Sequence, residues 1–285
     1  MTRRIIPIVL LLVFGIASIA SADALDNWHW RNPLPDGNDL KGLAYGNGLF
    51  VAVGSYGTIV TSTDKITWIK RSTDSIYNLF DVAFGDGKFV AVGDSTILSS
   101  VDGKSWVRQL NNWATGITYG NGLFVAVAGD NIFTSPDGVT WTKRIPPASN
   151  IGLNKVGYAK GIFVAFGHGS GGDIIATSSD GITWTQRYSG IPGSAGGPAG
   201  FAYGNDIFVI SGSGGVGITT TYTSHDGVEW TKHIFTPPAT SYTGVGLCFS
   251  NGVFMFVNSY GIETSLDGAD WAKKSSNIAL AQNLA

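Results

Sequence analysis

The sequence is poor in charge and nearly free of cysteine, and each shortage excludes a class of protein. Charged residues make up 13% of the 285 residues, against roughly 25% in typical soluble proteins. With a formal net charge of −2, the chain has no basic surface of the kind that binds nucleic acid or an anionic membrane. The single cysteine, Cys248, excludes an intramolecular disulfide. We therefore expect neither a nucleic-acid-binding protein nor a disulfide-stabilised scaffold.

The chain also lacks the common catalytic and metal-binding motifs. It contains no GxSxG or HExxH sequence, and its four histidines show no metal-ligand spacing. The run Gly212-x-Gly214-x-x-Gly217 matches a dinucleotide fingerprint, but a strand-like segment, residues 218–221, follows it where the fingerprint requires a helix. We therefore expect no enzymatic activity, no cofactor and no bound metal.

Residues 1–22 have the pattern of a secretory leader. Arg3 and Arg4 precede an apolar run from Ile5 to Ile19, and residues 20–22 form an Ala-Ser-Ala cleavage site. The run is short for a membrane span and contains a proline. We predict that the leader is removed and that residues 23–285 form a single domain without a stable membrane span. The protein is then secreted or periplasmic.

A box of the form Ser-x-Asp-Gly-x-x-Trp recurs along the chain. Successive box tryptophans lie 35 to 46 residues apart, a spacing typical of folds built from one repeated unit. The Asp accepts backbone N–H bonds in a tight turn, the Gly takes positive φ without strain, and the Trp is expected to wedge between sheets. The residues assigned to this structural role are Asp64, Asp102, Asp137, Asp180, Asp226, Asp267, Trp68, Trp106, Trp141, Trp184, Trp230 and Trp271.

Each repeat contains four short strand-like runs separated by turn residues. In the second repeat these runs are residues 81–84, 88–93, 96–99 and 105–108, and Asp86-Gly87 at the first turn favours a primed hairpin turn. Four antiparallel strands in about 40 residues indicate a propeller blade. We therefore predict an all-β fold, a β-propeller of about six four-stranded blades. Its repeats lie near residues 40–72, 80–109, 115–145, 154–188, 199–234 and 245–274.

Two fragments of the repeat flank the six complete units. Trp28-His29-Trp30-Arg31 has the Trp-x-x-Arg pattern of a fourth strand, and residues 278–283 have the pattern of a first strand. A partial seventh blade is therefore left open by the sequence.

Two positions inside the repeats lead to separate expectations. Cys248 aligns with alanine in three other repeats (Ala44, Ala83 and Ala202), so we predict that it is a small buried strand residue. Lys65 replaces the Gly of the first box. If that turn keeps a left-handed residue, Lys65 costs about 1–2 kcal/mol.

The repeats resemble those of the Asp-box, or bacterial neuraminidase repeat, superfamily of β-propellers. Residues 80–84 (Phe-Asp-Val-Ala-Phe), residues 53–59 (Val-Gly-Ser-Tyr-Gly-Thr-Ile) and Arg71 after Trp68 are similar to units of the propeller-type photosystem II stability and assembly factors. The boxes also resemble those of sialidase-like propellers. The resemblance covers nearly all of residues 26–274 and implies the propeller fold.

A sialidase, or a more divergent glycosidase, is the enzyme that this resemblance suggests. By resemblance, a sialidase would need three arginines around the substrate carboxylate, a Tyr–Glu pair and an acid Asp. The arginines after the leader follow the repeat, so we expect them around the ring rather than in one pocket: Arg31, Arg71, Arg108, Arg144 and Arg187. A glycosidase needs two carboxylates about 5–10 Å apart, and nothing in the sequence pairs the Asp residues outside the boxes. We therefore rank an enzyme below a binding protein.

The loops that link a fourth strand to the next blade share one face with the turns between second and third strands. The resemblance implies that this face binds ligands, and here it would carry Tyr56, Tyr77, Trp113, His168, Tyr188, Tyr242 and Tyr260. Aromatic side chains among Ser, Gly and Asn suit the recognition of protein or sugar. We predict a monomeric, non-enzymatic scaffold for a protein partner. A carbohydrate-binding, lectin-like propeller with a glycan ligand is the alternative.

Overall fold

The computed structural model describes residues 38–73, 76–189, 197–213, 219–235, 244–258 and 261–274, all within the compact unit Arg31–Ala285. The leader, the two flanking fragments, and the predicted site residues Tyr242 and Tyr260 lie outside the described residues. Within the described ranges, no helix is long and apolar enough to cross a membrane.

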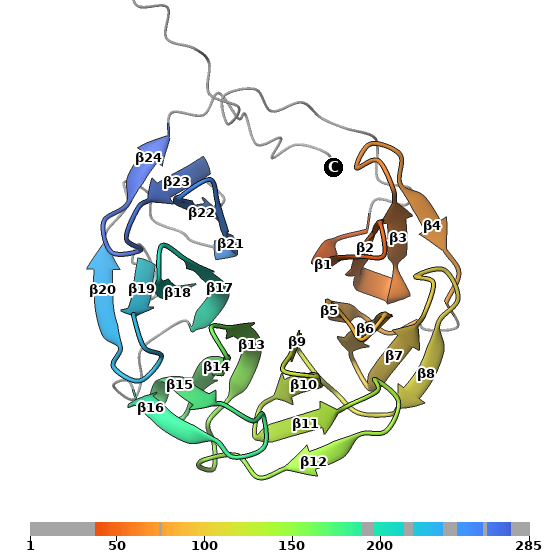
Figure 1. The fold of residues 1–285 in the computed structure, drawn as a ribbon, viewed down its shortest axis with the longest axis horizontal. Coiled ribbons are helices and arrows are strands. Elements are labelled where there is room, and N and C mark those ends of the chain that lie inside the picture. The colour runs from red at the N-terminus through yellow and green to blue at the C-terminus, as the bar shows by residue number, and fades with distance from the viewer. Residues whose placement is uncertain are drawn as a thin grey trace, which may run out of the picture. The chain divides into compact units, whose positions relative to one another are not determined.

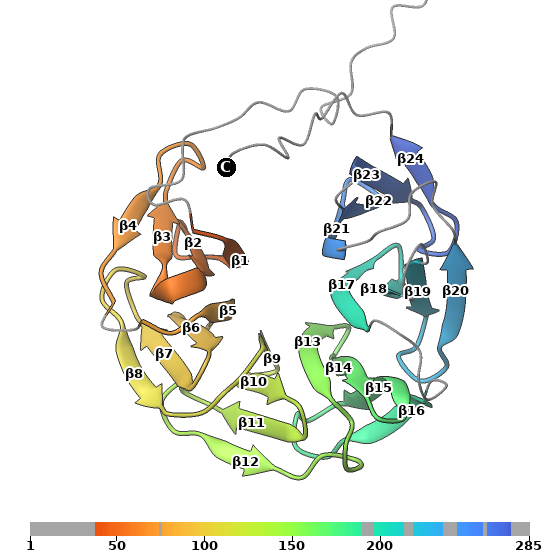
Figure 2. The ribbon, with the colours of Figure 1, turned by 180° about the vertical axis from the view of Figure 1, so that it is seen from behind.

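The described residues form six sheets of four antiparallel strands, placed as blades around a ring (Figure 1, Figure 2). Blade 1 contains β1 (Leu40–Gly46), β2 (Leu49–Gly54), β3 (Ile59–Ser62) and β4 (Ile69–Arg71). Blade 2 contains β5 (Leu79–Gly85), β6 (Lys88–Gly93), β7 (Thr96–Ser100) and β8 (Val107–Leu110). Blade 3 contains β9 (Gly116–Gly120), β10 (Leu123–Ala128), β11 (Asn131–Ser135) and β12 (Thr142–Arg144).

The second half of the ring repeats this arrangement. Blade 4 contains β13 (Leu153–Ala159), β14 (Ile162–Gly169), β15 (Gly172–Ser178) and β16 (Thr185–Ser189). Blade 5 contains β17 (Pro198–Gly204), β18 (Ile207–Ser213), β19 (Thr219–Ser224) and β20 (Thr231–Phe235). Blade 6 contains β21 (Gly244–Ser250), β22 (Val253–Asn258), β23 (Gly261–Ser265) and β24 (Ala272–Lys274). The prediction of an all-β propeller with six complete blades is confirmed.

In every blade the first strand is innermost and the fourth strand forms the rim (Figure 1). Consecutive inner strands pack on one another from β1 through β5, β9, β13 and β17 to β21. Because the strands alternate in direction, the two ends of a blade carry different turns. We call the end with the boxes the box face. The other end, with the turns between second and third strands and the links to the next blade, is the linking face.

Tight turns of the predicted kind join the first and second strands. Asn47 and Gly48 both have positive φ, at 49° and 73°, and β1 pairs directly with β2 from Gly46 and Leu49 outward. Asn and Gly tolerate this left-handed geometry better than other residues, and the resulting turn follows the twist of the strands. These short turns keep each hairpin compact at the box face.

The boxes form a hydrogen-bonded turn between the third and fourth strands. In blade 3, the Asp137 carboxylate accepts the backbone N–H groups of Val139 and Thr140 at 2.8 and 2.7 Å and the Ser135 hydroxyl at 2.9 Å. The indole N–H donates to the box glycine carbonyl in four copies: Trp106, Trp184, Trp230 and Trp271. The first copy keeps the same backbone, because Lys65 has φ 63°.

The box carboxylates make the stability of the fold depend on pH in the acidic range. Backbone N–H donors hold the pKa of Asp64, Asp137 and Asp180 at about 2, below the ordinary value of 3.8. Because the folded pKa is the lower one, each carboxylate stabilises the fold above the ordinary value, and this stabilisation is lost as the pH falls toward 2. We expect the melting temperature, followed by circular dichroism, to fall steeply between pH about 4 and about 2. The melting temperature of Asp137→Asn should fall less steeply over the same pH range. Equal slopes for the two proteins would contradict the assignment of the acid sensitivity to the box carboxylates.

Neighbouring blades pack through alternating large and small residues on the inner strands. A Cβ atom added to Gly46 would lie 2.1 Å from the Phe84 ring, and one added to Gly85 would lie 2.0 Å from the Tyr119 ring. On β5, the strand that carries Gly85, Val82 and Phe84 share a hydrophobic cluster with Ala44 of the preceding blade. Each inner strand therefore turns large side chains toward the preceding blade and small residues toward the next.

The prediction that Cys248 is buried is wrong. Cys248 is exposed on β21, although the alanines at the equivalent positions of blades 1, 2 and 5 are buried. These alanines face the next blade, and no further blade follows β21–β24 within the described residues. The burial of a small residue at this position therefore depends on a neighbouring blade rather than on the strand itself.

Candidate functional site

Five of the predicted ligand-binding residues are described, and they lie in two regions. Tyr56 lies in η1 (Ser55–Gly57), the turn between β2 and β3, while Tyr77 and Trp113 lie in the links that follow β4 and β8. His168 ends β14, and Tyr188 lies on β16. The first three residues belong to blades 1 to 3, and the other two belong to blade 4.

Tyr56 is an exposed aromatic residue in an unfavourable backbone conformation. It has φ 55° and ψ 38°, and 74% of its surface is exposed. Its backbone N–H donates to Asn78 Oδ1 at 3.1 Å, and the Asn78 amide in turn donates to Asp94 Oδ2 at 2.9 Å. A left-handed conformation costs a residue with a Cβ about 1–2 kcal/mol. Contacts to blade 2 thus hold the Tyr56 side chain outward. Because the side chain is exposed, burial of its surface does little to offset the cost of the left-handed conformation.

Tyr77 and Trp113 extend this aromatic surface. The Arg108 guanidinium lies 5.5 Å from the centre of the Tyr77 ring, a cation–π arrangement that orients the ring. Trp113 lies against Gly129, where an added Cβ would be 3.7 Å from the indole, yet 49% of Trp113 remains exposed. The neighbouring Ile76 is also exposed. Blades 1 to 3 therefore present apolar side chains held by specific contacts on the linking face.

His168 belongs to a buried polar network between blades 4 and 5. Its Nδ1 lies 2.8 Å from Asp173 Oδ1, and Lys232 Nζ lies 3.2 Å from Asp173 Oδ2. The same Oδ2 accepts a hydrogen bond from the Tyr222 hydroxyl. Burial and the bonded Asp173 carboxylate raise the pKa of Tyr222, so its hydroxyl stays protonated and donates. The ring of Tyr188 packs edge-on against Tyr222 at 5.1 Å. This network joins two blades, and all three of its donors meet on one carboxylate.

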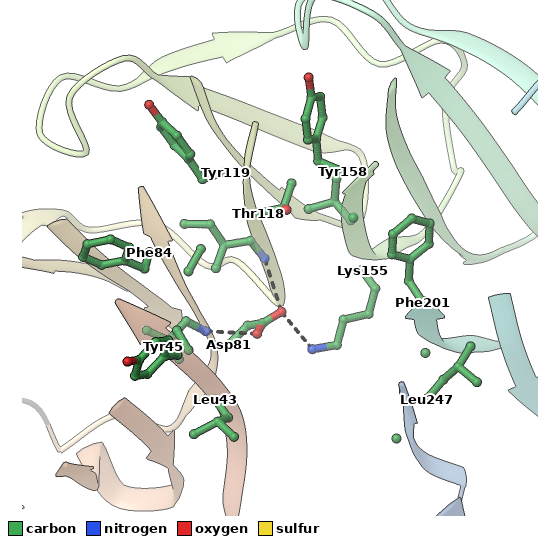
Figure 3. A pocket seen from close by; sticks show the side chains of 18 of the residues that line it. Leu43, Tyr45, Asp81, Phe84, Thr118, Tyr119, Lys155, Tyr158, Phe201 and Leu247 are labelled. Carbon is green, nitrogen blue, oxygen red and sulfur yellow. Dashed lines mark hydrogen bonds and ion pairs between the residues drawn. The ribbon is translucent and has the colours of Figure 1, made fainter. Parts of the chain in front are cut away.

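A pocket of about 530 Å³ lies at the centre of the ring, lined by residues of all six inner strands (Figure 3). Its lining combines apolar side chains, among them Leu43, Phe201 and Leu247, with the polar side chains of Asp81, Thr118 and Lys155 and the tyrosines Tyr45, Tyr119 and Tyr158. The volume is within the range of about 300–1,000 Å³ typical of ligand sites. The pocket is therefore a second candidate site, distinct from the linking face.

One ion pair crosses the wall of this pocket. Lys155 Nζ lies 3.1 Å from Asp81 Oδ2, and Asp81 also accepts the backbone N–H of Val82 at 3.0 Å (Figure 3). Between their strands lies Gly116, where a Cβ would be only 2.8 Å from Cα of Lys155. The missing side chain at Gly116 leaves room for Lys155 to reach from blade 4 to blade 2. This ion pair was not predicted from the sequence. Its signal is that the four other repeats carry Gly at this aligned position (Gly42, Gly116, Gly200 and Gly246).

Three of the four described arginines have structural partners on the outer strands, and the fourth, Arg108, lies over the Tyr77 ring. Arg71 Nε donates to Thr61 Oγ1 at 2.8 Å, and Arg144 and Arg187 make the same bond to Thr134 and Thr177. These bonds tie the fourth strand to the third strand in separate blades. Within the described ranges, no group of three or more His, Cys, Asp or Glu residues is placed to hold a metal ion.

The chain is similar to known proteins in its structure, but the sequence comparisons find no match. No protein-family model matches the chain, and no curated protein matches it. The structure of YCF48 bound to D1 peptide is 18% identical with a TM-score of 0.62, covering 85% of this chain and 84% of that one. YCF48 from Cyanidioschyzon merolae is 16% identical with a TM-score of 0.63, covering 85% and 87%.

An enzyme has a similar fold. The virginiamycin B lyase of Staphylococcus aureus is 14% identical with a TM-score of 0.70, covering 85% of this chain and 86% of that one. At such identities the likeness shows the fold alone. The resemblance inferred from the repeats therefore holds at the level of architecture, and the chain is a β-propeller of the type found in both YCF48 and the lyase.

Proposed function

We propose that this chain is a secreted, non-enzymatic β-propeller that binds a protein partner through the linking face of blades 1 to 3. The conformation of Tyr56 carries this proposal. The left-handed turn recurs in blade 2, where Ser95 at the aligned position has φ 51°, but blade 1 carries at this position a bulky, exposed tyrosine whose backbone is held by Asn78. Strain of this kind concentrates at binding and catalytic sites.

The chemistry of the surface favours protein as the ligand. Tyr and Trp are enriched at protein interfaces because they bring a large contact area with few rotatable bonds. Tyr56, Tyr77 and Trp113 are such residues, and their backbone and side-chain contacts orient them before a partner arrives. One structural neighbour, YCF48, has been solved with a D1 peptide, which agrees with a peptide or protein ligand for this architecture.

The use of the polar groups supports binding rather than catalysis. Asp81 is paired with Lys155, and Asp173 is engaged by His168, Tyr222 and Lys232. A general acid or base needs a proton-accepting atom within reach of the substrate. The acceptor atoms of these carboxylates are instead occupied by groups of their own and other blades, as expected for side chains that fix the structure.

Substitution of the exposed aromatic residues tests this function. We expect Trp113→Ala and Tyr56→Ala each to weaken capture of a protein from the extracytoplasmic fraction by roughly 30-fold, since interface anchors contribute about 2 kcal/mol or more. The melting temperature should change little, because 74% of Tyr56 and 49% of Trp113 are exposed. Val101→Ala is the matched control, because Val101 is an exposed apolar residue in the box of blade 2.

Two results would contradict the proposal. Equal loss of capture in Val101→Ala would show that general surface apolarity, rather than the linking face, holds the partner. Saturable binding to an immobilised glycan, lost in Trp113→Ala, in the absence of any captured protein would favour the lectin-like alternative.

A further inference from the structure

The central pocket contains one pair of opposite charges in otherwise uncharged surroundings. Among the described residues that line it, Asp81 and Lys155 are the only charged ones. Their side chains are 19% and 31% exposed, and the Lys155 side chain extends from β13 to meet Asp81 on β5 (Figure 3). Removing a charged pair from water costs free energy unless the remaining polar atoms of the pair find partners. The pair is therefore a costly feature of this wall.

The fold itself does not require these two side chains. At the aligned position the other four inner strands carry glycine, namely Gly42, Gly116, Gly200 and Gly246, and those strands still pack on their neighbours. Gly116 leaves the space in which the two charged side chains meet, since a Cβ atom there would be 2.8 Å from Cα of Lys155. The charged pair is thus an addition to the repeat, and it faces the pocket.

The pair keeps hydrogen-bonding capacity that the contacts among the described residues do not use. An ammonium group has three N–H donors, and Lys155 uses one of them to reach Asp81 Oδ2 at 3.1 Å. Asp81 Oδ1 accepts the Val82 N–H at 3.0 Å, and the Ile117 N–H lies farther away, 3.4 Å from Oδ2. A carboxylate oxygen can accept two hydrogen bonds, so Oδ1 keeps one acceptor position. Lys155 can therefore bind an anionic group while Asp81 binds a cationic group beside it.

An apolar wall lies next to the pair. Phe201 and Leu247 line the pocket and are partly buried, and Figure 3 shows both on the same side of Asp81 as Lys155. The Phe201 ring is held in place, because it stacks on Phe166 at 6.2 Å and lies over Gly157, where a Cβ atom would be 2.2 Å from it. A ligand that reaches the ion pair therefore has a fixed apolar surface beside it.

These features together favour a zwitterionic ligand. A ligand with one charge would leave the pocket with a net charge, because no other charged side chain among the described residues lines it, and an unpaired charge away from water is costly. A neutral apolar ligand would displace water from the Lys155 amine without offering it an acceptor. A zwitterion supplies a partner to each charge and keeps the net charge of the pocket at zero.

We propose that the central pocket binds a free α-amino acid with an apolar side chain. Its carboxylate accepts the N–H donors of Lys155, its ammonium group donates to Asp81, and its side chain packs on Phe201 and Leu247. An α-amino acid carries both charged groups on one carbon atom, which suits protein groups that themselves lie 3.1 Å apart. No proton is transferred, so the site binds without catalysing a reaction. It is separate from the aromatic surface of the linking face.

Isothermal titration calorimetry with four ligands tests this recognition. L-Leucine should bind saturably to the purified protein. N-acetyl-leucine, which lacks the ammonium group, and leucinamide, which lacks the carboxylate, should each bind at least about tenfold more weakly, because each loses a hydrogen bond between charged groups. Glycine keeps both charges but has no side chain to bury, and it should also bind at least about tenfold more weakly.

Variants of the protein locate the site. Lys155→Met and Asp81→Asn each remove one charge with little change in shape, and each should weaken leucine binding by about tenfold or more. Both variants should fold, because four blades carry glycine at this position. Lys160→Met is the matched control. It removes the same charge from an ion pair with Asp206, and neither residue lines the pocket. This control should bind leucine as the unchanged protein does.

Three results would overturn the proposal. Absence of saturable leucine binding by the folded protein would show that the pocket is not an amino-acid site. Equal binding of leucine and leucinamide, or of leucine and N-acetyl-leucine, would show that the two charges are not read as a pair. Equal weakening by Lys155→Met and Lys160→Met would place the leucine elsewhere. Capture of a protein through Trp113 is measured with a different ligand, so this proposal and the proposed function can fail separately.

Discussion

Gly85→Leu should lower the free energy of unfolding by about 3 kcal/mol, because overpacking of a close-packed interface costs about 1–3 kcal/mol or more. A Cβ at this position would lie 2.0 Å from the Tyr119 ring of blade 3. The ring is packed on Phe124 at 4.7 Å and has little room to move. Denaturation in urea, followed by tryptophan fluorescence, gives the free energy difference directly.

Ser250→Leu is the control for this prediction. Ser250 ends β21 as Gly85 ends β5, but it is exposed and has no following blade among the described residues. The same side chain should therefore change stability by less than about 0.5 kcal/mol, the usual range for surface substitutions. A large loss in Ser250→Leu would mean that another element covers this face. Blade 4 already carries Ala159 at the aligned position. The ring therefore tolerates a methyl group there, and Gly85→Ala would be a weaker test than Gly85→Leu.

Asp173→Ala should destabilise the protein by a similar amount, about 3 kcal/mol, the lower end of the range for breaking a buried ion pair. The Asp173 side chain is only 3% exposed and is paired with Lys232, whose side chain is 25% exposed. Its removal leaves the Lys232 amine and the buried Tyr222 hydroxyl without their acceptor. Urea denaturation measures the loss, and Tyr222→Phe, which removes one donor and leaves the charges paired, should cost less.

Asp206→Ala is the matched surface control. Asp206 pairs with Lys160 at 2.6 Å, but the two side chains are 68% and 44% exposed. Exposed pairs contribute about 0–1 kcal/mol, so this substitution should change stability little. If Asp173→Ala cost no more than Asp206→Ala, the network between blades 4 and 5 would not be a fixed structural junction.

The repeated part of this protein could be predicted from the sequence because it depends on local chemistry. The box fixes its own turn through Asp137 and its neighbours, and Asn-Gly pairs such as Asn47-Gly48 fix the hairpins. Both devices act within a few residues, so their spacing along the chain indicates the blade, and the count of boxes indicates the number of blades.

The features that could not be predicted depend on contacts between blades. The burial of the Cys248 position depends on whether a blade follows it, which no local pattern encodes. Asp81 and Lys155 lie 74 positions apart in the sequence and meet only because the ring brings blades 2 and 4 around Gly116. Asp173 follows the glycine-rich residues 169–172, which carry no local signal of its role, and its partners Tyr222 and Lys232 come from the next blade.

Lys65 shows how a departure from the repeat can carry structural information. As a local feature it predicts only a strained turn, and its φ of 63° agrees with that. Compared with Gly103 and Gly181, which pack on the preceding blade, it also marks the blade that, among the described residues, has no second strand ahead of it. The same comparison singles out Asp81 and Lys155, because the other four repeats carry glycine at the aligned position.

Site-specific photo-cross-linking at Tyr56 tests most directly the claim that this propeller binds protein through its linking face. A photoreactive phenylalanine is placed at position 56, or at position 266 on the box face as control, and cells expressing the protein are irradiated. We predict one discrete protein adduct from position 56 that is absent from position 266 and is reduced by Trp113→Ala. Adducts of equal yield from both positions, or none from position 56 in folded protein, would contradict the account.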